Sequence, residues 1–448
     1  MKKIQLSSSP NPITVIGGGL AGCEAAWQIA SRGLRVRLYE MRPVRSTPAH
    51  TTSHLAEVVC SNSLKSDLPH NASWLLKQEL RRMGSLLMKI ADTVRVPAGS
   101  ALAVDREQFA IQTSEAIAGH PNIELIREEV PSIPSEGIVI VASGPLTSGA
   151  LSESIRAFCG SDHLYFYDAI SPIVDAETID YSKAYRASRY GKGDDDYINC
   201  PMNADEYGKF YDALITAEAV PIHEFEEPRY FESCLPIEEL ARRGRDTLRF
   251  GPMRPVGLVD PRSGRMPWAV VQLRQEDRMQ SSYNIVGFQN HLKFADQRHV
   301  LRLIPGLENA EFLRLGQIHR NTYIHAPQVL TASMASRQEP RVFFAGQLAG
   351  TEGYIENIAS GLVAGINAVQ EFRNADPAIF PAECSIGALC RYISTPCAHF
   401  APMNIHYGLL PAMNFAHRTP KAEKQRMLSD RALDALSHFA GVLQSCPA

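Results

Sequence analysis

The stretch Ile13-Thr14-Val15-Ile16-Gly17-Gly18-Gly19-Leu20-Ala21-Gly22 decides the fold class of this chain. Its β-branched run predicts a short strand, and its glycines predict a tight turn. A helix-forming segment over 24–31 and a second predicted strand, Val36-Arg37-Leu38-Tyr39-Glu40, follow directly. This order of strand, turn, helix and strand is typical of the opening of a parallel α/β domain.

The turn also fits the pattern G-x-G-x-x-G of dinucleotide-binding domains. Gly17 permits the tight turn, Gly19 lets the backbone approach a pyrophosphate, and Gly22 allows close packing of the helix. The helix amino terminus stabilises the phosphates, and Glu40 can accept hydrogen bonds from ribose hydroxyls. A purely structural turn is the alternative, but the complete context favours a dinucleotide site. The predicted cofactor-binding residues are Gly17, Gly18, Gly19, Leu20, Ala21, Gly22 and Glu40.

The glycine motif alone does not choose between FAD and NAD. Its position near the amino terminus favours FAD, and so does a late apolar run, 342–346, that ends in Gly346. We expect the glycines after this run to bring backbone amides up to an isoalloxazine ring. They are Gly346, Gly350, Gly353, Gly361 and Gly365, of which Gly346 and Gly353 join the predicted cofactor-binding residues together with Gly144, at the end of the run 138–142.

The three apolar runs 13–16, 138–142 and 342–346 are predicted to share one sheet, although most of the chain separates them. The intervening part then forms an inserted domain. We therefore expect an α/β fold in which residues 1–160 and 315–448 form a Rossmann-like FAD-binding domain and residues 161–314 form an α+β insertion. Helices are predicted over 361–372 and 429–443.

Composition narrows the classes of function. The chain has 448 residues, a net charge of -3 and 45% hydrophobic residues, which is typical of a folded globular protein without a global attraction for nucleic acid. The first ten residues lack the apolar core of a signal peptide, and the longest apolar run is far too short for a membrane helix, so we expect a cytoplasmic protein without a membrane partner. The nine cysteines include no Cys-x-x-Cys pair, so neither a disulfide framework nor a metal site is expected.

Two cysteines differ from the usual small buried thiol. Cys60 lies where an apolar run gives way to the polar segment Ser61-Asn62-Ser63, which indicates exposure at the end of an element. Cys234 precedes Leu235-Pro236-Ile237-Glu238-Glu239, where Pro236 suits a first helical position. A thiol at a helix start has a lowered pKa, which is typical of a reactive cysteine. The spacing of Cys384, Cys390 and Cys397 suits no common metal site, and we interpret these three as structural.

The segment 242–278 is rich in arginine, with nine arginines against four acidic residues. A solvated charged face explains this composition as well as a surface that contacts phosphate does. The 14 histidines form no H-E-x-x-H motif and no readable hydrolase triad. The candidate RNA-binding residues are Arg242, Arg243, Arg245 and Arg254.

Long, specific motifs are spread through the chain. They are Tyr39-Glu40-Met41-Arg42-Pro43, Val59-Cys60-Ser61-Asn62-Ser63-Leu64, Pro97-Ala98-Gly99, Ala101-Leu102-Ala103-Val104-Asp105-Arg106, Phe231-Glu232, Cys234, Pro236-Ile237-Glu238, Gly251-Pro252-Met253, Pro255-Val256-Gly257-Leu258, His319-Arg320-Asn321-Thr322, Gly353-Tyr354 and Glu356. In these motifs the chain resembles the folate- and FAD-dependent tRNA (uracil-5-)-methyltransferase family, TrmFO, over nearly its whole length. The longer MnmG-type (GidA-like) flavoproteins share the amino-terminal motif but lack the Cys-Ser-Asn-Ser segment.

The resemblance implies C5 methylation of a uridine in the tRNA T-loop, at position 54. Methylenetetrahydrofolate supplies the carbon, FAD is the cofactor, and NAD(P)H recharges the flavin. The two family cysteines fall on Cys60 and Cys234. Addition of a thiolate to C6 of uracil makes C5 nucleophilic, and we favour Cys234 as that nucleophile, with Cys60 protecting it or acting as the base.

The alternatives are the same chemistry on a 23S ribosomal RNA uridine, a flavin oxidoreductase or MnmG-like tRNA-modifying flavoprotein, and an RNA-binding flavoprotein without catalysis. Which cysteine attacks, NADH or NADPH as reductant, and the oligomeric state all stay open.

Overall fold

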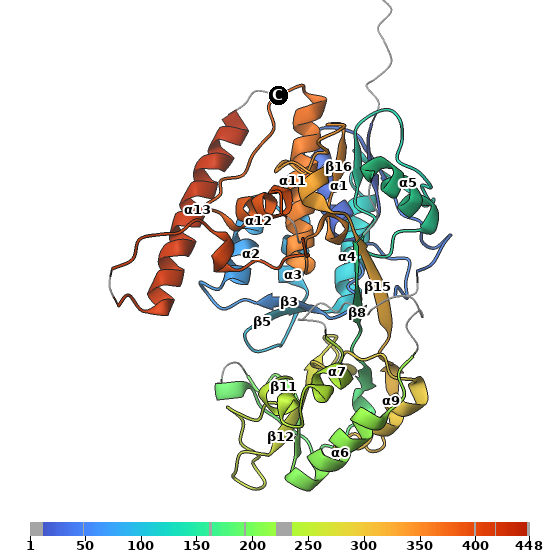
Figure 1. Ribbon diagram of the computed structural model, residues 1–448, viewed down its shortest axis with the longest axis vertical. Helices are drawn as coiled ribbons and strands as arrows, with labels where there is room; N and C mark the ends of the chain where they lie inside the picture. Colours follow the sequence, from blue (N-terminus) through green and yellow to red (C-terminus); the bar gives the residue numbers. More distant parts are fainter. Residues whose placement is uncertain are drawn as a thin grey trace, which may run out of the picture.

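The computed structural model describes residues 12–47, 49–160, 164–191, 194–220, 235–397, 400–416 and 418–445. At 164–168, 318–320 and 444–445 only the backbone is described. Two bodies of secondary structure lie one above the other in Figure 1, joined by the ribbon of β8 (Leu164–Ala169) and β15 (Ile318–Tyr323). These two strands pair antiparallel.

The first body is built on a five-stranded sheet in the order β16-β7-β1-β2-β6, and every pairing in it is parallel. The predicted α/β architecture is confirmed, because strands from both ends of the chain share this sheet. Its strands are β1 (Ile13–Ile16), β2 (Val36–Tyr39), β6 (Ile123–Ile126), β7 (Val139–Val141) and β16 (Val342–Phe344).

The register of this sheet aligns the carboxyl ends of its strands. Ile16 pairs with Tyr39 on one side and with Val141 on the other, and Val141 pairs with Phe344. Residues that follow these four strands therefore meet at one edge of the sheet, which is where ligands of open α/β sheets bind.

Two helices of the first body pack unusually closely. α1 (Leu20–Ala30) lies against α11 (Tyr354–Phe372), which begins seven residues before the predicted helix (361 minus 354). A Cβ on Gly361 would lie 2.2 Å from the Ala21 carbonyl oxygen, and one on Gly365 would lie 2.7 Å from that of Ala25. The predicted role of these two glycines beside a flavin is wrong, because both serve the contact between the helices.

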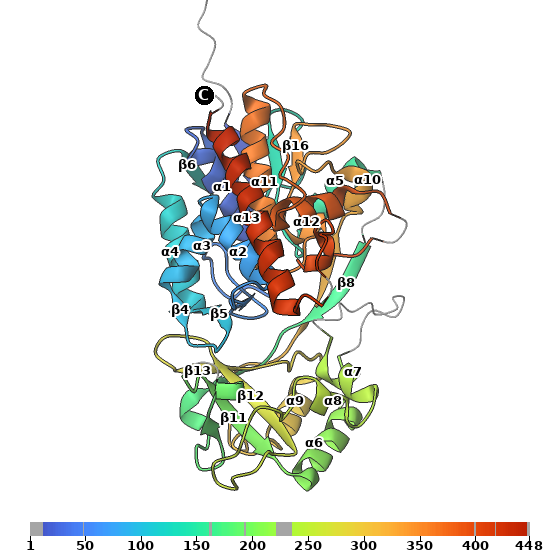
Figure 2. The ribbon, with the colours of Figure 1, turned by 90° about the vertical axis from the view of Figure 1, so that its left-hand side faces the viewer.

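The remaining elements of the first body cover the sheet and extend it. α13 packs against α2 (Figure 2), where Arg82 donates to the Leu433 carbonyl at 3.0 Å. α13 begins at Lys421, earlier than predicted. None of the helices in the described ranges combines the length and the apolar character needed to cross a membrane. These elements are β3 (Ser63–Ser66), α2 (Ala72–Arg82), α3 (Leu86–Thr93), β4 (Arg95–Val96), β5 (Ala101–Val104), α4 (Arg106–Ala118), α5 (Gly149–Cys159), α10 (Ala326–Val329), α12 (Ser385–Ser394) and α13 (Lys421–Ser445).

The second body has a six-stranded sheet in the order β10-β11-β12-β13-β9-β14 with antiparallel pairing. It has an apolar core of its own, formed by residues between Val174 and Ala310, whereas the buried residues of the first core come from both sides of this segment. Its elements are β9 (Ile173–Asp175), β10 (Tyr185–Arg186), β11 (Tyr197–Met202), α6 (Ala204–Thr216), α7 (Ile237–Arg242), α8 (Thr247–Phe250), β12 (Ala269–Gln275), β13 (Ser282–Ile285), α9 (Phe294–Leu301) and β14 (Phe312–Arg314).

A buried carboxyl group ties two helices of the first body together. Glu79 of α2 is fully buried and accepts hydrogen bonds from the backbone N–H groups of Ser385 (2.7 Å) and Ile386 (2.9 Å) at the start of α12. Burial raises its pKa to about 7, although the two N–H groups oppose this shift. The folded protein therefore binds a proton at Glu79 that the unfolded chain releases near pH 4.5.

We expect this raised pKa to make the wild-type protein less stable as the pH rises from about 4.5 to about 7. A shift of this size corresponds to about 3 kcal/mol. Glu79→Gln removes the ionisation, so its free energy of unfolding relative to wild type should increase by about that amount across this interval. Urea unfolding at several pH values measures the difference, with the exposed Glu153→Gln as the control. Parallel stability curves for wild type and Glu79→Gln would contradict the prediction.

Candidate active site

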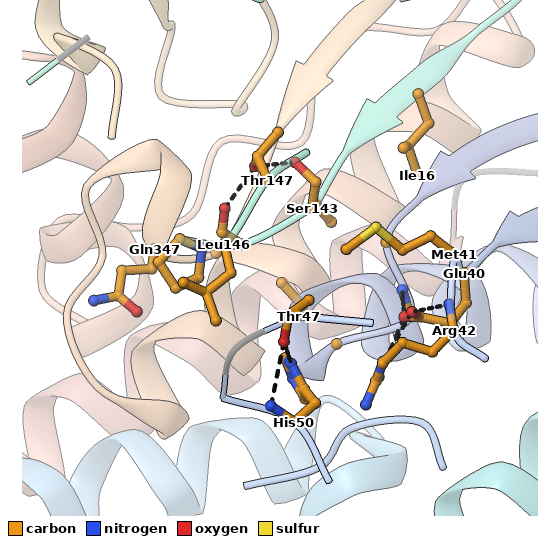
Figure 3. A pocket seen from close by; sticks show the side chains of 18 of the residues that line it. Ile16, Glu40, Met41, Arg42, Thr47, His50, Ser143, Leu146, Thr147 and Gln347 are labelled. Atoms are coloured by element: carbon orange, nitrogen blue, oxygen red, sulfur yellow. Dashed lines mark hydrogen bonds and ion pairs between the residues drawn. The ribbon is translucent and has the colours of Figure 1, made fainter. Parts of the chain in front are cut away.

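A large cavity opens at the carboxyl edge of the parallel sheet. Its empty space, including the open mouth, is about 1220 Å³. Figure 3 shows side chains from several strand ends facing it. The lining includes the predicted residues Gly17, Gly18, Gly19, Leu20, Ala21, Glu40, Gly144 and Gly346, and also Cys60.

The glycine turn has the geometry that a bound pyrophosphate needs. Gly17 has a φ of +106°, and a Cβ on Gly22 would lie 1.8 Å from the Gly17 carbonyl oxygen. Gly22 is absent from the cavity lining because it serves this tight packing. A Cβ on Gly19 would instead meet nothing within 4 Å, and Gly19 is the N-cap of α1 without a side-chain capping bond. The open space before a helix amino terminus suits an anion.

Glu40 lies at the cavity wall, and its carboxylate is already well supplied with donors. Oε2 accepts from the Gly18 N–H at 3.0 Å, and Oε1 accepts from the Arg42 N–H (3.0 Å) and Nε (2.9 Å). Burial raises the pKa of Glu40, but the hydrogen bonds and charge of Arg42 outweigh it, so the net pKa is lowered. The ionised carboxylate fixes the loop around Gly18, and a ribose hydroxyl must share an oxygen with these donors.

Hydroxyl and ring groups complete the wall on the other side. The Thr47 hydroxyl lies 2.6 Å from Nδ1 of His50, and the Ser143 hydroxyl lies 2.7 Å from that of Thr147 (Figure 3). Sequence reasoning did not single out these four residues, because isolated hydroxyls carry no pattern. They line the cavity because the loops that follow β2 and β7 form part of its wall.

Two glycines of the late segment have different surroundings. Gly346 follows β16, lines the cavity and donates its N–H to the Ser360 hydroxyl at 2.8 Å. Gly353 is the N-cap of α11 and lies outside the lining. A Cβ there would lie 2.5 Å from both Lys65 Nζ and Glu356 Oε2. Gly353 therefore makes room for the ion pair between Lys65 and the buried Glu356 (2.5 Å), rather than lining the cavity.

Cys60 lies at the cavity where the two bodies meet. The hydroxyl of Tyr354, the first residue of α11, accepts hydrogen bonds from the N–H groups of Cys60 (2.8 Å) and Ser61 (3.2 Å). From the second body, Arg274 of β12 donates to the Ser61 hydroxyl at 2.7 Å and to the Asn62 side chain at 2.9 Å. The Cys60 segment, residues 59–62, is thus held from both bodies.

Two guanidinium groups also hold this segment. Arg106 and Arg314 both donate to the Val59 carbonyl, at 3.1 and 2.9 Å. Burial lowers the pKa of both arginines. The charge and the hydrogen bond of the nearby Glu276 outweigh this effect, so the pKa of Arg106 is raised overall. For Arg314, the positive charge of Arg106 lowers the pKa further. Cys60 contributes to the electrostatic environment of both groups, so a thiolate there would interact favourably with two cations.

Cys234 lies outside the described residues, but the helix predicted after it is confirmed. α7 begins at Ile237, with Glu238 and Glu239 in its first turn and Pro236 as the N-cap instead of the first helical residue. α7 has six residues, so few peptide dipoles add up at its start.

Of the three cysteines that we interpreted as structural, two are buried and one is exposed. Cys384 and Cys390 are in the core of the first body, and burial raises the pKa of Cys390 to about 12. Such a thiol is a poor nucleophile at neutral pH. Cys397 is exposed and lies outside the core.

The arginine candidates lie in the second body, in and after α7. Arg242 pairs with Glu239, and Arg245 pairs with Asp212 at 2.8 Å. Arg243 is the C-cap of α7. Arg254 is exposed, and no side chain in the described ranges pairs with it. Carboxylates therefore partly neutralise Arg242 and Arg245, whereas Arg254 has no such partner among the described residues.

Asn321 is a cavity residue that sequence reasoning placed in a motif without assigning it a role. It is 4% exposed, it lines the cavity from within β15, and its side chain has no hydrogen-bond partner among the described residues. Tyr354, Gln347 and Asn357 also line the cavity, and Tyr354 contacts Cys60. In the sequence these are polar residues close to a glycine-rich segment. This pattern indicates a cavity wall only after the preceding strand has been placed in the sheet.

The chain matches the sequence profile of the family described as "Glucose inhibited division protein A" over residues 12–376. The structure of GidA from Aquifex aeolicus superimposes with a TM-score of 0.70 at 18% identity, and the match covers 96% of this chain and 73% of that one. The predicted fold class, a GidA-like Rossmann domain with an insertion, agrees with this likeness.

Sequence relatives are much closer. A protein of Geobacter sulfurreducens named methylenetetrahydrofolate--tRNA-(uracil-5-)-methyltransferase TrmFO is 56% identical over 429 residues, which is 95% of this chain and 98% of that protein. A protein of the same name from Anoxybacillus flavithermus is 53% identical over 428 residues, which is 95% of this chain and 99% of that protein.

Proposed function

Because the chain belongs to the TrmFO family, we propose that it methylates C5 of the uridine at position 54 in the tRNA T-loop. The product is 5-methyluridine, methylenetetrahydrofolate supplies the carbon, and NAD(P)H reduces the bound FAD. The observation that carries the proposal is the position of Cys60, a thiol at the wall of a cavity that also contains a dinucleotide-binding turn. A plain nucleotide-binding protein has no need of a thiol at this place.

The residues of the cavity fit FAD. Gly17, Gly19 and the start of α1 provide the turn, the open space and the amino terminus that a pyrophosphate requires. Gly346 and Cys60 line the same cavity, so we expect the isoalloxazine ring to lie beside them. Bound FAD, once reduced, supplies the electrons that convert the transferred one-carbon unit to a methyl group.

We assign the domains as the sequence predicted them. Residues 1–160 and 315–448 form the FAD-binding domain, and residues 161–314 form the insertion domain for RNA and folate. The two separate apolar cores support this division. The hydrogen bonds from Arg274 to the Cys60 segment, residues 59–62, support an active site shared between the domains.

The two thiols have different roles in the reaction at the uracil ring: Cys234 is the nucleophile and Cys60 is the base. Cys234 Sγ forms a bond to C6, and the electron pair moves to C5, which then bonds to the one-carbon unit from the folate. The C5 proton next leaves to a base, and the bond from the one-carbon unit to its carrier nitrogen breaks, which leaves an exocyclic methylene. The two electrons and the proton that bound, reduced FAD would supply convert this methylene to the methyl group as the C6–S bond breaks and the thiolate of Cys234 returns. Cys60 is the base in this scheme, because the nearby Arg106 and Arg314 favour its anionic form.

The target base must leave the folded T-loop to reach the thiols. Extrusion of a base costs a few kcal/mol, which contacts to the phosphate backbone and stacking in the pocket offset.

The proposal predicts the modified nucleoside and the RNA that contains it. In a strain without the gene, 5-methyluridine should disappear from tRNA and remain unchanged in 23S ribosomal RNA. Mass spectrometry of nucleosides from the separated RNAs measures both, and the purified protein with methylenetetrahydrofolate and NAD(P)H should restore the tRNA signal. Loss of the nucleoside from ribosomal RNA alone would identify ribosomal RNA as the substrate instead of tRNA. No loss from either RNA would contradict the methyltransferase function.

A further inference from the structure

Several arginines of the insertion domain already have an acidic partner. Besides the pairs of Arg242 and Arg245, Arg249 pairs with Asp246 at 2.7 Å and Arg262 pairs with Asp260 at 3.0 Å. Arg249 also lies over the ring of Trp268, 3.6 Å from its centroid. A guanidinium that is neutralised in this way attracts a phosphate weakly, so the arginine count of the segment overstates its positive field.

Arg189 and Arg254 are among the arginines of this domain that have no acidic partner in the described ranges. Arg189 donates through Nε to the Gln272 side chain (2.8 Å) and through Nη1 to the Val256 carbonyl (2.9 Å). Its Nη2 has no partner among the described residues. Burial and the neighbouring charge of Arg254 both lower its pKa, and no carboxylate is among the other main influences, which are tyrosines. Two like charges are therefore held near each other without neutralisation, and an anion would relieve their repulsion.

An exposed aromatic ring stands beside this pair of arginines. Tyr190 is 61% exposed and has a φ of +59°, in the left-handed region that tyrosine rarely adopts. Its N–H donates to the Gly257 carbonyl at 2.9 Å, and a Cβ on Gly257 would lie 2.9 Å from its ring. The local backbone thus holds the ring in place on the surface, where a base can stack on it.

The same sheet face reaches the Cys60 segment. Gln272 and Arg274 are two residues apart on β12, so their side chains point to the same face, about 7 Å apart along the strand. Gln272 holds Arg189, and its amide also donates to Asn199 of β11 at 2.9 Å. Arg274 holds Ser61 and Asn62. One rigid strand therefore connects the arginine pair to the thiol segment.

We propose that Arg189 and Arg254 bind the backbone phosphates of the substrate RNA next to the target uridine, with an unpaired base stacked on Tyr190. This inference rests on the proposed function and names the RNA contact that serves it. Guanidinium groups that are free to form paired hydrogen bonds suit phosphate oxygens, and an exposed aromatic ring suits an unpaired base. The arginines that have acidic partners, Arg242, Arg245, Arg249 and Arg262, then have a structural role on the domain surface.

The salt dependence of tRNA binding tests the assignment. Affinity of the FAD-loaded protein for an unmodified tRNA transcript is measured at several salt concentrations for wild type, Arg189→Gln, Arg254→Gln and the double variant. Each lost phosphate contact should lower the slope of log K against log salt by about 0.7–0.9. Arg245→Gln is the matched control, because it removes an exposed arginine of the same domain that is already paired, and its slope should equal that of wild type.

Tyr190 is tested separately. Tyr190→Ala should weaken tRNA binding about tenfold without changing the slope, and Tyr190→Phe should retain wild-type affinity, because stacking needs the ring and not the hydroxyl. Flavin absorbance and thermal unfolding of each variant show whether the fold and the cofactor are retained.

The outcomes separate this inference from the proposed function. If the slope stays unchanged in the double variant while wild type methylates tRNA, the arginine assignment is wrong and the methyltransferase function stands. If wild type binds tRNA with the expected slopes but yields no 5-methyluridine, the RNA surface stands and the function is wrong. A slope that falls equally in Arg245→Gln would show a diffuse positive field instead of a defined contact, and would overturn the inference.

Discussion

Cys234→Ala is expected to abolish methyl transfer from methylenetetrahydrofolate and to leave FAD content unchanged. Activation of uracil requires a covalent bond from a thiolate to C6, and without the nucleophile C5 stays unreactive. Binding of tRNA should stay within about tenfold of wild type, or roughly 1.4 kcal/mol, because backbone contacts supply most of the affinity. Product formation, flavin absorbance and tRNA affinity are the three measurements.

The roles of the two thiols are separated by trapping. A T-loop RNA that contains 5-fluorouridine cannot lose its C5 substituent as a proton, so the covalent adduct accumulates on the nucleophile. We expect the adduct in wild type and in Cys60→Ala, but not in Cys234→Ala. Cys384→Ala is the control, since this thiol is buried at the start of α12 and should leave turnover per folded molecule unchanged. If only Cys60→Ala prevents the adduct, the roles are reversed, and if neither does, the methyltransferase proposal fails.

Gly19→Val is expected to give a colourless, folded protein. The backbone of Gly19 is extended (φ -77°, ψ -170°), which valine adopts readily, and a Cβ there meets nothing within 4 Å. The free protein should therefore retain its stability. The new side chain would occupy the space before the amino terminus of α1, where the pyrophosphate must lie, so FAD affinity should fall at least 100-fold, or roughly 2.7 kcal/mol.

Two further glycine variants make this result specific. Gly441→Val in α13 also meets open space but lies far from the cavity, so both stability and FAD content should match wild type. Gly22→Ala places a Cβ 1.8 Å from the Gly17 carbonyl oxygen, so it should lower stability and FAD content together. Flavin absorbance and thermal unfolding of the three proteins check the prediction. A yellow Gly19→Val protein with wild-type flavin content would disprove the assignment of the turn.

The amino-terminal strand, turn and helix could be predicted from the sequence because all of their determinants are local. β1 matches the predicted strand residue for residue, and β2 ends one residue earlier than predicted. Gly17, Gly19 and Gly22 have backbone roles that follow from their spacing alone. Local patterns did not predict the methyltransferase reaction. That prediction came from the resemblance to a family, which rests on motifs far apart in the chain.

Other features depended on contacts between distant segments. Gly361 and Gly365 resembled cofactor glycines in sequence, but they proved to be the contact surface of α11 on α1, more than three hundred residues away. Nothing near either residue in the sequence specifies that partner, since helix packing is set by the face the whole chain presents.

The sequence by itself determined the fold class and the glycine turn, and it singled out Cys60 and Cys234 as candidates, because each depends on residues close together or on motifs that recur as units. Only the tertiary structure decided that Cys60 lies at the cavity between Tyr354 and Arg274, and that Arg245 is neutralised by Asp212 whereas Arg189 and Arg254 are not. The physical reason is that charge pairing and cavity walls depend on which side chains meet in space. Those meetings are fixed by the packing of the sheets and helices and leave no periodic signal in the chain.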